Sequence, residues 1–317
     1  MSPSKLTKLA LRLAVSGGLI WWVLRKVDAD SFFTQLEKVS VAAFLLPVLL
    51  ILFFGLIQVK RWTLVQGALS EPLPFFLAAK ILFLSLFFNQ TLPSTIGGDA
   101  IRVTYAYRAG LDLNAVVKGV LIDRLSALLA LVLMSGFTLP LLYDSIGDHP
   151  FATLVSIMVG GGLAGALVLL ALAAVPPAIR RWPGLHQAAG LADALWVVLR
   201  QPGQAALVML ISLLIHIALG FVVYYLAWLL DSGVDPLICL TLYPTIFLVS
   251  MLPISIAGWG VREGAMVAAF TLVGASHADA LAISLLFGAA MVVVGLCGVL
   301  IWYLAERWGR ARSRQPG

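Results

Sequence analysis

The chain has 317 residues, of which 61% are hydrophobic and only 11% are charged, and its mean hydropathy is +1.02. A soluble globular protein needs more polar surface than this, and several apolar runs exceed the roughly 18 residues that indicate a transmembrane helix. The composition therefore predicts an all-α integral membrane protein that forms a single membrane domain over residues 1–317. The net charge of +6 does not indicate nucleic-acid binding, because in a membrane protein the position of basic residues matters more than their total.

Apolar runs of about 20 residues predict six full spans. In chain order these cover about 9–25, 41–59, 117–140, 151–175, 204–230 and 278–304. Two further apolar stretches, 75–112 and 237–274, are interrupted in the middle, and we expect each to form a re-entrant hairpin of two half-helices. Segment 178–200 mixes Arg and Asp with Leu and Trp, which predicts a cytoplasmic interfacial helix, and residues 305–317 form a basic tail.

The two interrupted stretches contain the same motif. Residues 92–102 read LPSTIGGDAIR and residues 252–262 read LPISIAGWGVR, an ungapped echo 160 positions apart. In both copies an arginine follows the proline by nine positions. Matching Pro/Gly breaks in two halves of a chain are typical of transporters built from structural repeats. We therefore predict two repeats, about 9–140 and about 151–304.

The distribution of basic residues predicts the orientation of these repeats. If both hairpins enter and leave on one side, only Arg25, Lys26 and Lys38 fall on the outer side. Fourteen basic residues fall on the opposite side: Lys5, Lys8, Arg12, Lys60, Arg61, Arg108, Lys118, Arg180, Arg181, Arg200, Arg307, Arg310, Arg312 and Arg314. By the positive-inside rule both termini are then cytoplasmic. Each repeat has the order span, span, re-entrant hairpin, span, and the two are inverted, so the hairpin tips are expected to approach one another near the midplane.

The helix breaks predict an anion site. In hydrocarbon a broken helix is tolerated only against protein or a wet cavity, because the freed backbone groups need partners. Each break presents the N-terminus of the returning helix, which attracts anions. Arg102 and Arg262 follow within the first turn or so, and we expect Asp99 and Glu263 to orient them around a phosphate-bearing headgroup. The predicted substrate-binding residues are Asn89, Ser94, Thr95, Gly97, Gly98, Asp99, Arg102, Asp123 and Arg124 in the first repeat and Gly258, Gly260, Arg262 and Glu263 in the second.

These residues also have structural interpretations, which stay open. Asp99 can cap the returning helix, and the polar residues around the first break can satisfy freed backbone groups rather than touch a ligand. Arg102 and Arg262 can be ion-pair partners that lock the hairpins in place.

Other polar residues inside the spans have competing interpretations too. Asp123 and Arg124 are adjacent in a helical span and point in different directions, so we expect each to pair elsewhere. His216 in an apolar span is more often a hydrogen-bonded core residue than a proton relay. The sequence contains no phosphate-binding loop, no hydrolase motif and no His/Cys cluster with metal spacing, so we predict no catalytic residues, no metal and no cofactor.

At these motifs the chain resembles the lysylphosphatidylglycerol synthase transmembrane region family, also called flippase-like domain proteins. The resemblance is carried by FFNQTLPSTIGGDAIR, LIDRLSALL and PISIAGWGVREG and covers nearly the whole sequence. In bifunctional members this region is linked to moving an aminoacylated phospholipid across the inner membrane, while a separate soluble domain makes that lipid. No such soluble stretch occurs in this sequence, so the resemblance implies a stand-alone, multi-pass inner-membrane member without synthase activity.

The resulting expectation is a translocase, not an enzyme, that moves an anionic or lipid-linked phosphate headgroup between leaflets. Two alternatives are a membrane scaffold for a glycosyltransferase or lipid synthase partner, and an enzyme that acts on a lipid phosphate. The sequence leaves the lipid, the driving force and the oligomeric state open.

Overall fold

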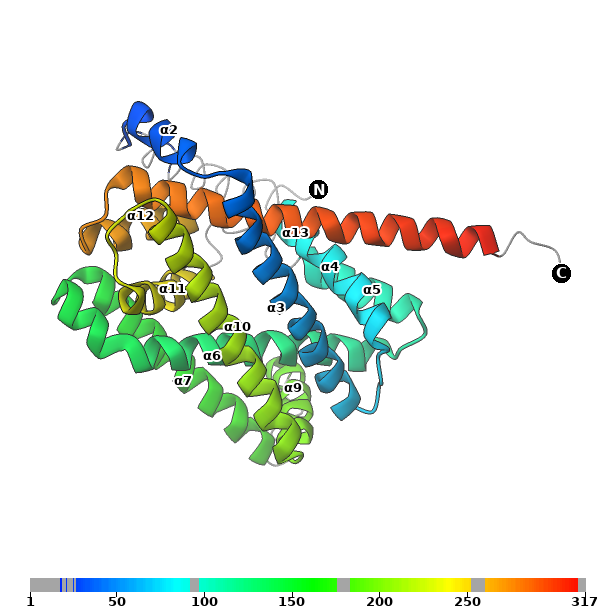
Figure 1. The fold of residues 1–317 in the computed structure, drawn as a ribbon. Helices are drawn as coiled ribbons and strands as arrows, with labels where there is room; N and C mark the ends of the chain where they lie inside the picture. The colour runs from blue at the N-terminus through cyan, green and yellow to red at the C-terminus, as the bar shows by residue number, and fades with distance from the viewer. Residues whose placement is uncertain are drawn as a thin grey trace.

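The structure is a computed structural model that describes residues 27–91, 97–175, 183–251 and 260–312, together with Gly18, Trp21 and Arg25. Within this part of the chain every regular element is a helix (Figure 1). Five helices are long and apolar enough to cross a membrane: α3 (Val41–Ala68), α6 (Leu113–Ile146), α7 (Pro150–Ala174), α10 (Pro202–Leu229) and α13 (His277–Arg312). They confirm the all-α membrane fold and five of the six predicted spans; the predicted span 9–25 falls outside the described residues, apart from three isolated positions.

Each interrupted stretch folds as two shorter helices. These are α4 (Phe75–Thr91) and α5 (Gly97–Arg108), then α11 (Pro236–Ser250) and α12 (Val261–Leu272). At 1.5 Å per residue they are about 18 to 26 Å long, shorter than the roughly 30 Å hydrocarbon core. The half-helices match the predicted hairpins, whereas residues 92–96 of the first motif and 252–259 of the second lie outside the described residues.

Two shorter helices complete the described fold. α2 (Ala29–Glu37) precedes α3, and α9 (Pro183–Leu199) occupies most of the predicted interfacial segment 178–200. α9 packs against α3, α6, α7 and α10, and it buries Ala192 and Val198 there. Its position relative to a membrane surface stays a prediction.

Side-chain caps explain where several helices begin. The Ser40 hydroxyl accepts the Ala43 N–H at the start of α3, and the Asp112 carboxylate accepts the Ala115 N–H at the start of α6. Such caps satisfy backbone donors that have no partner within the helix. α3 then continues through Gly67 to Ala68, nine residues past the predicted end of its span, and Ser70, with a φ of 61°, and Pro72 follow its end.

The helix contacts follow a twofold pattern. The most extensive contact joins α4 of the first half with α13 of the second, and its counterpart joins α11 of the second half with α6 of the first. The same correspondence pairs α3 with α10, α4 with α11, α5 with α12 and α6 with α13. Under it, the contact between α5 and α6 corresponds to the contact between α12 and α13, and the contact between α3 and α6 corresponds to that between α10 and α13. All four contacts are present. Each hairpin is therefore packed against the last span of the other half.

α3 and α10 lie side by side and run in opposite directions (Figure 1). The Gln201 side chain, just before α10, donates to the Ala68 carbonyl at the end of α3. The Tyr225 hydroxyl near the end of α10 donates to the Ala43 carbonyl at the start of α3. Since the repeats relate α3 to α10, this antiparallel pairing supports the predicted inverted repeat over a parallel one.

Candidate functional site

The centre of the candidate site is Asp123 of α6, which binds two arginines from different helices. Its Oδ1 lies 2.8 Å from Nε of Arg61 on α3, and its Oδ2 lies 2.8 Å from a terminal nitrogen of Arg102 on α5. The three side chains are 1%, 3% and 4% exposed, respectively. The carboxylate thus joins a full span, α3, to the returning helix of hairpin one.

Further contacts hold both guanidinium groups. Arg61 also donates to the Ser212 hydroxyl of α10 at 3.0 Å, so the cluster reaches a fourth helix. Arg102 lies over the ring of the fully buried Trp62, with its central carbon 4.3 Å from the ring centroid. An arginine in this position combines a charge-assisted hydrogen bond with a cation–π contact, a combination that a lysine ammonium cannot reproduce.

Asp99 and Arg124 extend the cluster to the protein surface. Asp99 lies 3.8 Å from Arg102, and its other carboxylate oxygen pairs with Nε of Arg124. The Arg124 side chain is 41% exposed, whereas that of Asp99 is 11% exposed. Three guanidinium groups and two carboxylates leave this charge cluster (Arg61, Asp99, Arg102, Asp123 and Arg124) with one formal positive charge.

These pairings match some of the sequence expectations and correct one. Asp123 and Arg124 do pair in different directions, and each has a partner on hairpin one, Arg102 and Asp99 respectively. Arg61 was expected on the cytoplasmic side, beyond the end of the span 41–59, but it is buried inside α3, because the helix continues through it. The sequence held one signal for this burial. Arg61 and the apolar Val65 are four residues apart, so they share one face if the helix continues past residue 59.

The Asn89 side chain provides a hydrogen-bond acceptor for a backbone N–H at the start of α5, as the structural interpretation expected. The Asn89 amide oxygen accepts the Gly98 N–H at 3.1 Å. A Cβ at Gly98 would overlap the Ser85 carbonyl oxygen and the Asn89 side chain, so glycine is required for this close approach. Gly97 begins the helix and is buried, and the predicted Ser94 and Thr95 lie outside the described residues.

The second copy of the motif has a different local arrangement. Arg262 donates to the Glu263 carboxylate through two nitrogens at 2.6 and 3.0 Å, and both residues are buried. The other Glu263 oxygen accepts the N–H of Gly260, whose φ of 87° favours glycine. Glu263 thus both pairs with the arginine and caps α12, while the predicted Gly258 lies outside the described residues.

The two halves differ in the residues at corresponding positions of the predicted repeats. The position equivalent to Asp123 is the buried Ile283, and the position equivalent to Arg61 is Phe221. A carboxylate that ties the hairpin to the spans is present in the first half, whereas apolar residues, the buried Ile283 and the exposed Phe221, occupy the equivalent positions in the second.

A family model described as lysylphosphatidylglycerol synthase TM region matches residues 9–298. The chain belongs to this family. The match covers most of the sequence, including both hairpins, and it places the chain among membrane proteins involved in lipid handling. No curated protein matches the chain.

Two other kinds of site were considered in the sequence, a proton relay at His216 and a metal site. His216 interacts through both ring nitrogens, with the Tyr243 hydroxyl at 3.3 Å and the Ala127 carbonyl at 3.0 Å, which is the environment of a structural core histidine. No group of three or more His, Cys, Asp or Glu side chains that could hold a metal ion occurs among the described residues.

Proposed function

We propose that the protein is a lipid translocase, without enzymatic activity, that moves an anionic or lipid-linked phosphate headgroup between the leaflets of the inner membrane, with both termini in the cytoplasm. The observation that carries this proposal is the buried charge cluster with its net positive charge, attached to the returning helix of a re-entrant hairpin. Charged groups inside a membrane protein are costly to bury, and they mark substrate paths by default.

Arg124 is the member of the cluster that a phosphate can reach from outside. Its side chain is 41% exposed, so an incoming phosphate would compete with Asp99 for the Arg124 guanidinium. Arg102 is 4% exposed and bound to Asp123, so it would hold α5 in place or contact the headgroup only after α5 moves. Arg262 and Glu263 would act at the opposite hairpin in the same way.

Family membership supports lipid as the substrate, and the sequence contains no hydrolase motif, which supports movement without chemical change. A scaffold for a lipid synthase or glycosyltransferase partner, and an enzyme that acts on a lipid phosphate, remain the competing proposals.

Reconstituted vesicles with fluorescent phosphatidylglycerol separate these three functions. We expect the wild-type protein to exchange the lipid between leaflets, measured by reduction of the outer-leaflet fluorophore. We expect Arg124→Gln to slow exchange at least about tenfold, because a hydrogen bond to a charged group contributes about 1.5–3 kcal/mol. Arg200→Gln, which removes an exposed arginine at the end of α9, is the matched control and should exchange normally.

Mass spectrometry of the recovered lipid completes the test. A chemically changed headgroup would favour the enzyme, and neither exchange nor chemical change would favour the scaffold.

A further inference from the structure

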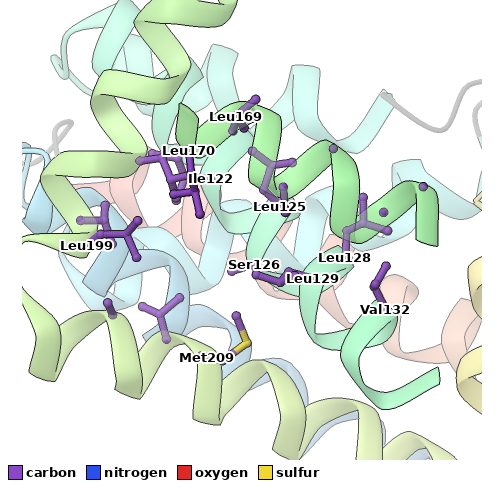
Figure 2. A pocket seen from close by; sticks show the side chains of 18 residues that line it. Ile122, Leu125, Ser126, Leu128, Leu129, Val132, Leu169, Leu170, Leu199 and Met209 are labelled. Carbon is purple, nitrogen blue, oxygen red and sulfur yellow. The ribbon is translucent and has the colours of Figure 1, made fainter. Parts of the chain in front are cut away.

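A cavity of about 440 Å³ lies between α6, α7, α9 and α10 (Figure 2). α6 contributes Ile122, Leu125 and Leu129 to its wall, and α7 contributes Gly161 and Gly165. On α6, Asp123 and Arg124 are rotated by about 100° and 200° from Ile122, since successive helix residues differ by about 100°. The cavity is therefore centred on a different face of α6 from Asp123, and none of the five residues of the charge cluster lines it.

The wall of the cavity suits hydrocarbon rather than water. Among the described residues that line it, the one polar side chain is that of Ser126, whose hydroxyl already donates to the Asp123 carbonyl at 2.8 Å. A cavity without polar partners does not hold ordered water. One of its walls is α7, a candidate membrane span of which only 11% is buried within the protein, so the hydrocarbon of the bilayer is the adjacent phase.

The dimensions suit one acyl chain. Figure 2 shows Leu199 and Ile122 toward one end of the cavity and Val132 toward the other. The ten helical steps from Ile122 to Val132 span about 15 Å along α6, which is also about half of the 30 Å hydrocarbon core, or one leaflet.

A helix of a second copy of this chain is the competing occupant, because Gly161 and Gly165 have the G-x-x-x-G spacing of helix-packing motifs. The basic residue at one end of the cavity, described next, favours a lipid over a helix, and the crosslinking experiment below separates the two occupants.

A basic residue lies beyond the end of the cavity that contains Ile122. Lys118 precedes Ile122 by one helical turn on the same face of α6, and its ammonium lies beside Gly190 of α9. The Lys118 side chain is half-buried, and it makes no ion pair or hydrogen bond with the residues that the structure describes. A lysine in this position extends its stem along apolar surface and presents its charge at headgroup depth, where it attracts anionic lipid.

We propose that this cavity binds one acyl chain of an anionic membrane lipid whose phosphate contacts Lys118. The site requires a membrane around the protein but no transport activity, and it lies apart from the charge cluster that carries the proposed function.

Photo-crosslinking of the full chain in vesicles tests the proposal. The probes are phosphatidylglycerol and phosphatidylcholine with a diazirine on one acyl chain, and adducts are mapped by peptide mass spectrometry. Gly165→Leu should lose the adducts on α6, α7 and α10, because a Cβ at Gly165 meets no atom within 4 Å and the leucine fills the cavity without displacing protein atoms. Gly160→Leu, an adjacent glycine that also has open space and does not line the cavity, should keep them. Gly161→Leu is a second filling variant should Gly165→Leu fold poorly.

The headgroup contact is tested separately. Wild-type protein should label more strongly with phosphatidylglycerol than with phosphatidylcholine, and Lys118→Gln should lower this preference about fivefold, the effect expected of one lysine at an anionic surface. Lys60→Gln, which removes an exposed lysine of α3, is the control. Equal labelling by the two probes in the wild type would overturn the contact with Lys118.

Unchanged adducts in Gly165→Leu would overturn the acyl-chain site. A shift of that variant from dimer to monomer in native mass spectrometry, with lipid labelling retained, would assign the cavity to a second copy. Leaflet exchange is not read out, so the result stands whether or not the protein transports lipid.

Discussion

Asp123 is the residue on which the charge cluster depends, since it compensates two buried arginines on different helices. Asp123→Asn removes the charge with little change in volume and leaves Arg61 and Arg102 without a full counter-charge. Removal of one partner from a buried ion pair destabilises a protein by about 3–5 kcal/mol. We expect a loss of this order in the free energy of unfolding, measured by denaturant titration in mild detergent.

The control for this change is Asp144→Asn, near the end of α6. Asp144 is exposed, so its replacement should alter stability by no more than about 0.5 kcal/mol. Equal stability of the Asp123 and Asp144 variants would show that the cluster contributes nothing to holding hairpin one.

Replacing Arg102 tests whether this arginine binds the substrate or only holds hairpin one in place. Arg102→Lys keeps the charge but loses the planar fork that binds Asp123 while the guanidinium lies over Trp62. We expect a folded protein in which leaflet exchange is slowed about tenfold, the equivalent of one charge-assisted hydrogen bond. Wild-type exchange in a folded lysine variant would exclude a bidentate contact between Arg102 and phosphate.

At the scale of the helices, the contact between hairpin one and α13 depends on two glycines. A Cβ at Gly298 would lie 2.5 Å from the carbonyl group of Phe83 on α4, and one at Gly295 would lie 2.8 Å from the Phe87 Cα. Small residues at such positions let helix backbones approach closely in membranes. We expect Gly298→Ala to lower the free energy of unfolding by about 1–3 kcal/mol, the usual effect of overpacking.

The matched helical control is Gly67→Ala on α3, where a Cβ meets no atom within 4 Å. Alanine there should be neutral or stabilise the protein by up to about 1 kcal/mol, because it favours the helix. Thermal unfolding of the two variants side by side checks the sign, and a stabilising Gly298→Ala would contradict the close helix contact.

The two hairpins should open to opposite sides of the membrane. Glu71 lies just before α4, and Asp235 caps the start of α11, where its side chain accepts the Leu237 N–H. With Cys239 and Cys297 replaced by alanine, Glu71→Cys should react with a membrane-impermeant maleimide only from the cytoplasm and Asp235→Cys only from outside. Reaction of both from the same side would contradict the inverted arrangement.

At the scale of the whole molecule, local sequence predicted the elements but not their partners. The apolar runs indicated the five confirmed spans, and the Pro/Gly breaks indicated that 75–112 and 237–274 form half-helices, because these signals depend on neighbouring residues. The bond from Arg61 to Ser212 joins residues 151 positions apart, and nothing local to either residue indicates it. The exchange of hairpins between the halves is likewise a long-range property that a repeat in the sequence does not specify.

This exchange implies that the halves do not fold alone. α4 of the first half packs mainly on α13 of the second, and α11 packs on α6, so either half by itself would expose the apolar faces that these contacts cover. A break between Gly147 and Asp148, in the exposed turn between α6 and α7, separates the halves without cutting a helix. We expect residues 1–147 and 148–317 to co-purify when they are co-expressed, and each to be degraded or to aggregate when it is expressed alone. A monodisperse, helical 1–147 fragment in detergent, without its partner, would show that the first half is stable without the contacts from α13 and α11.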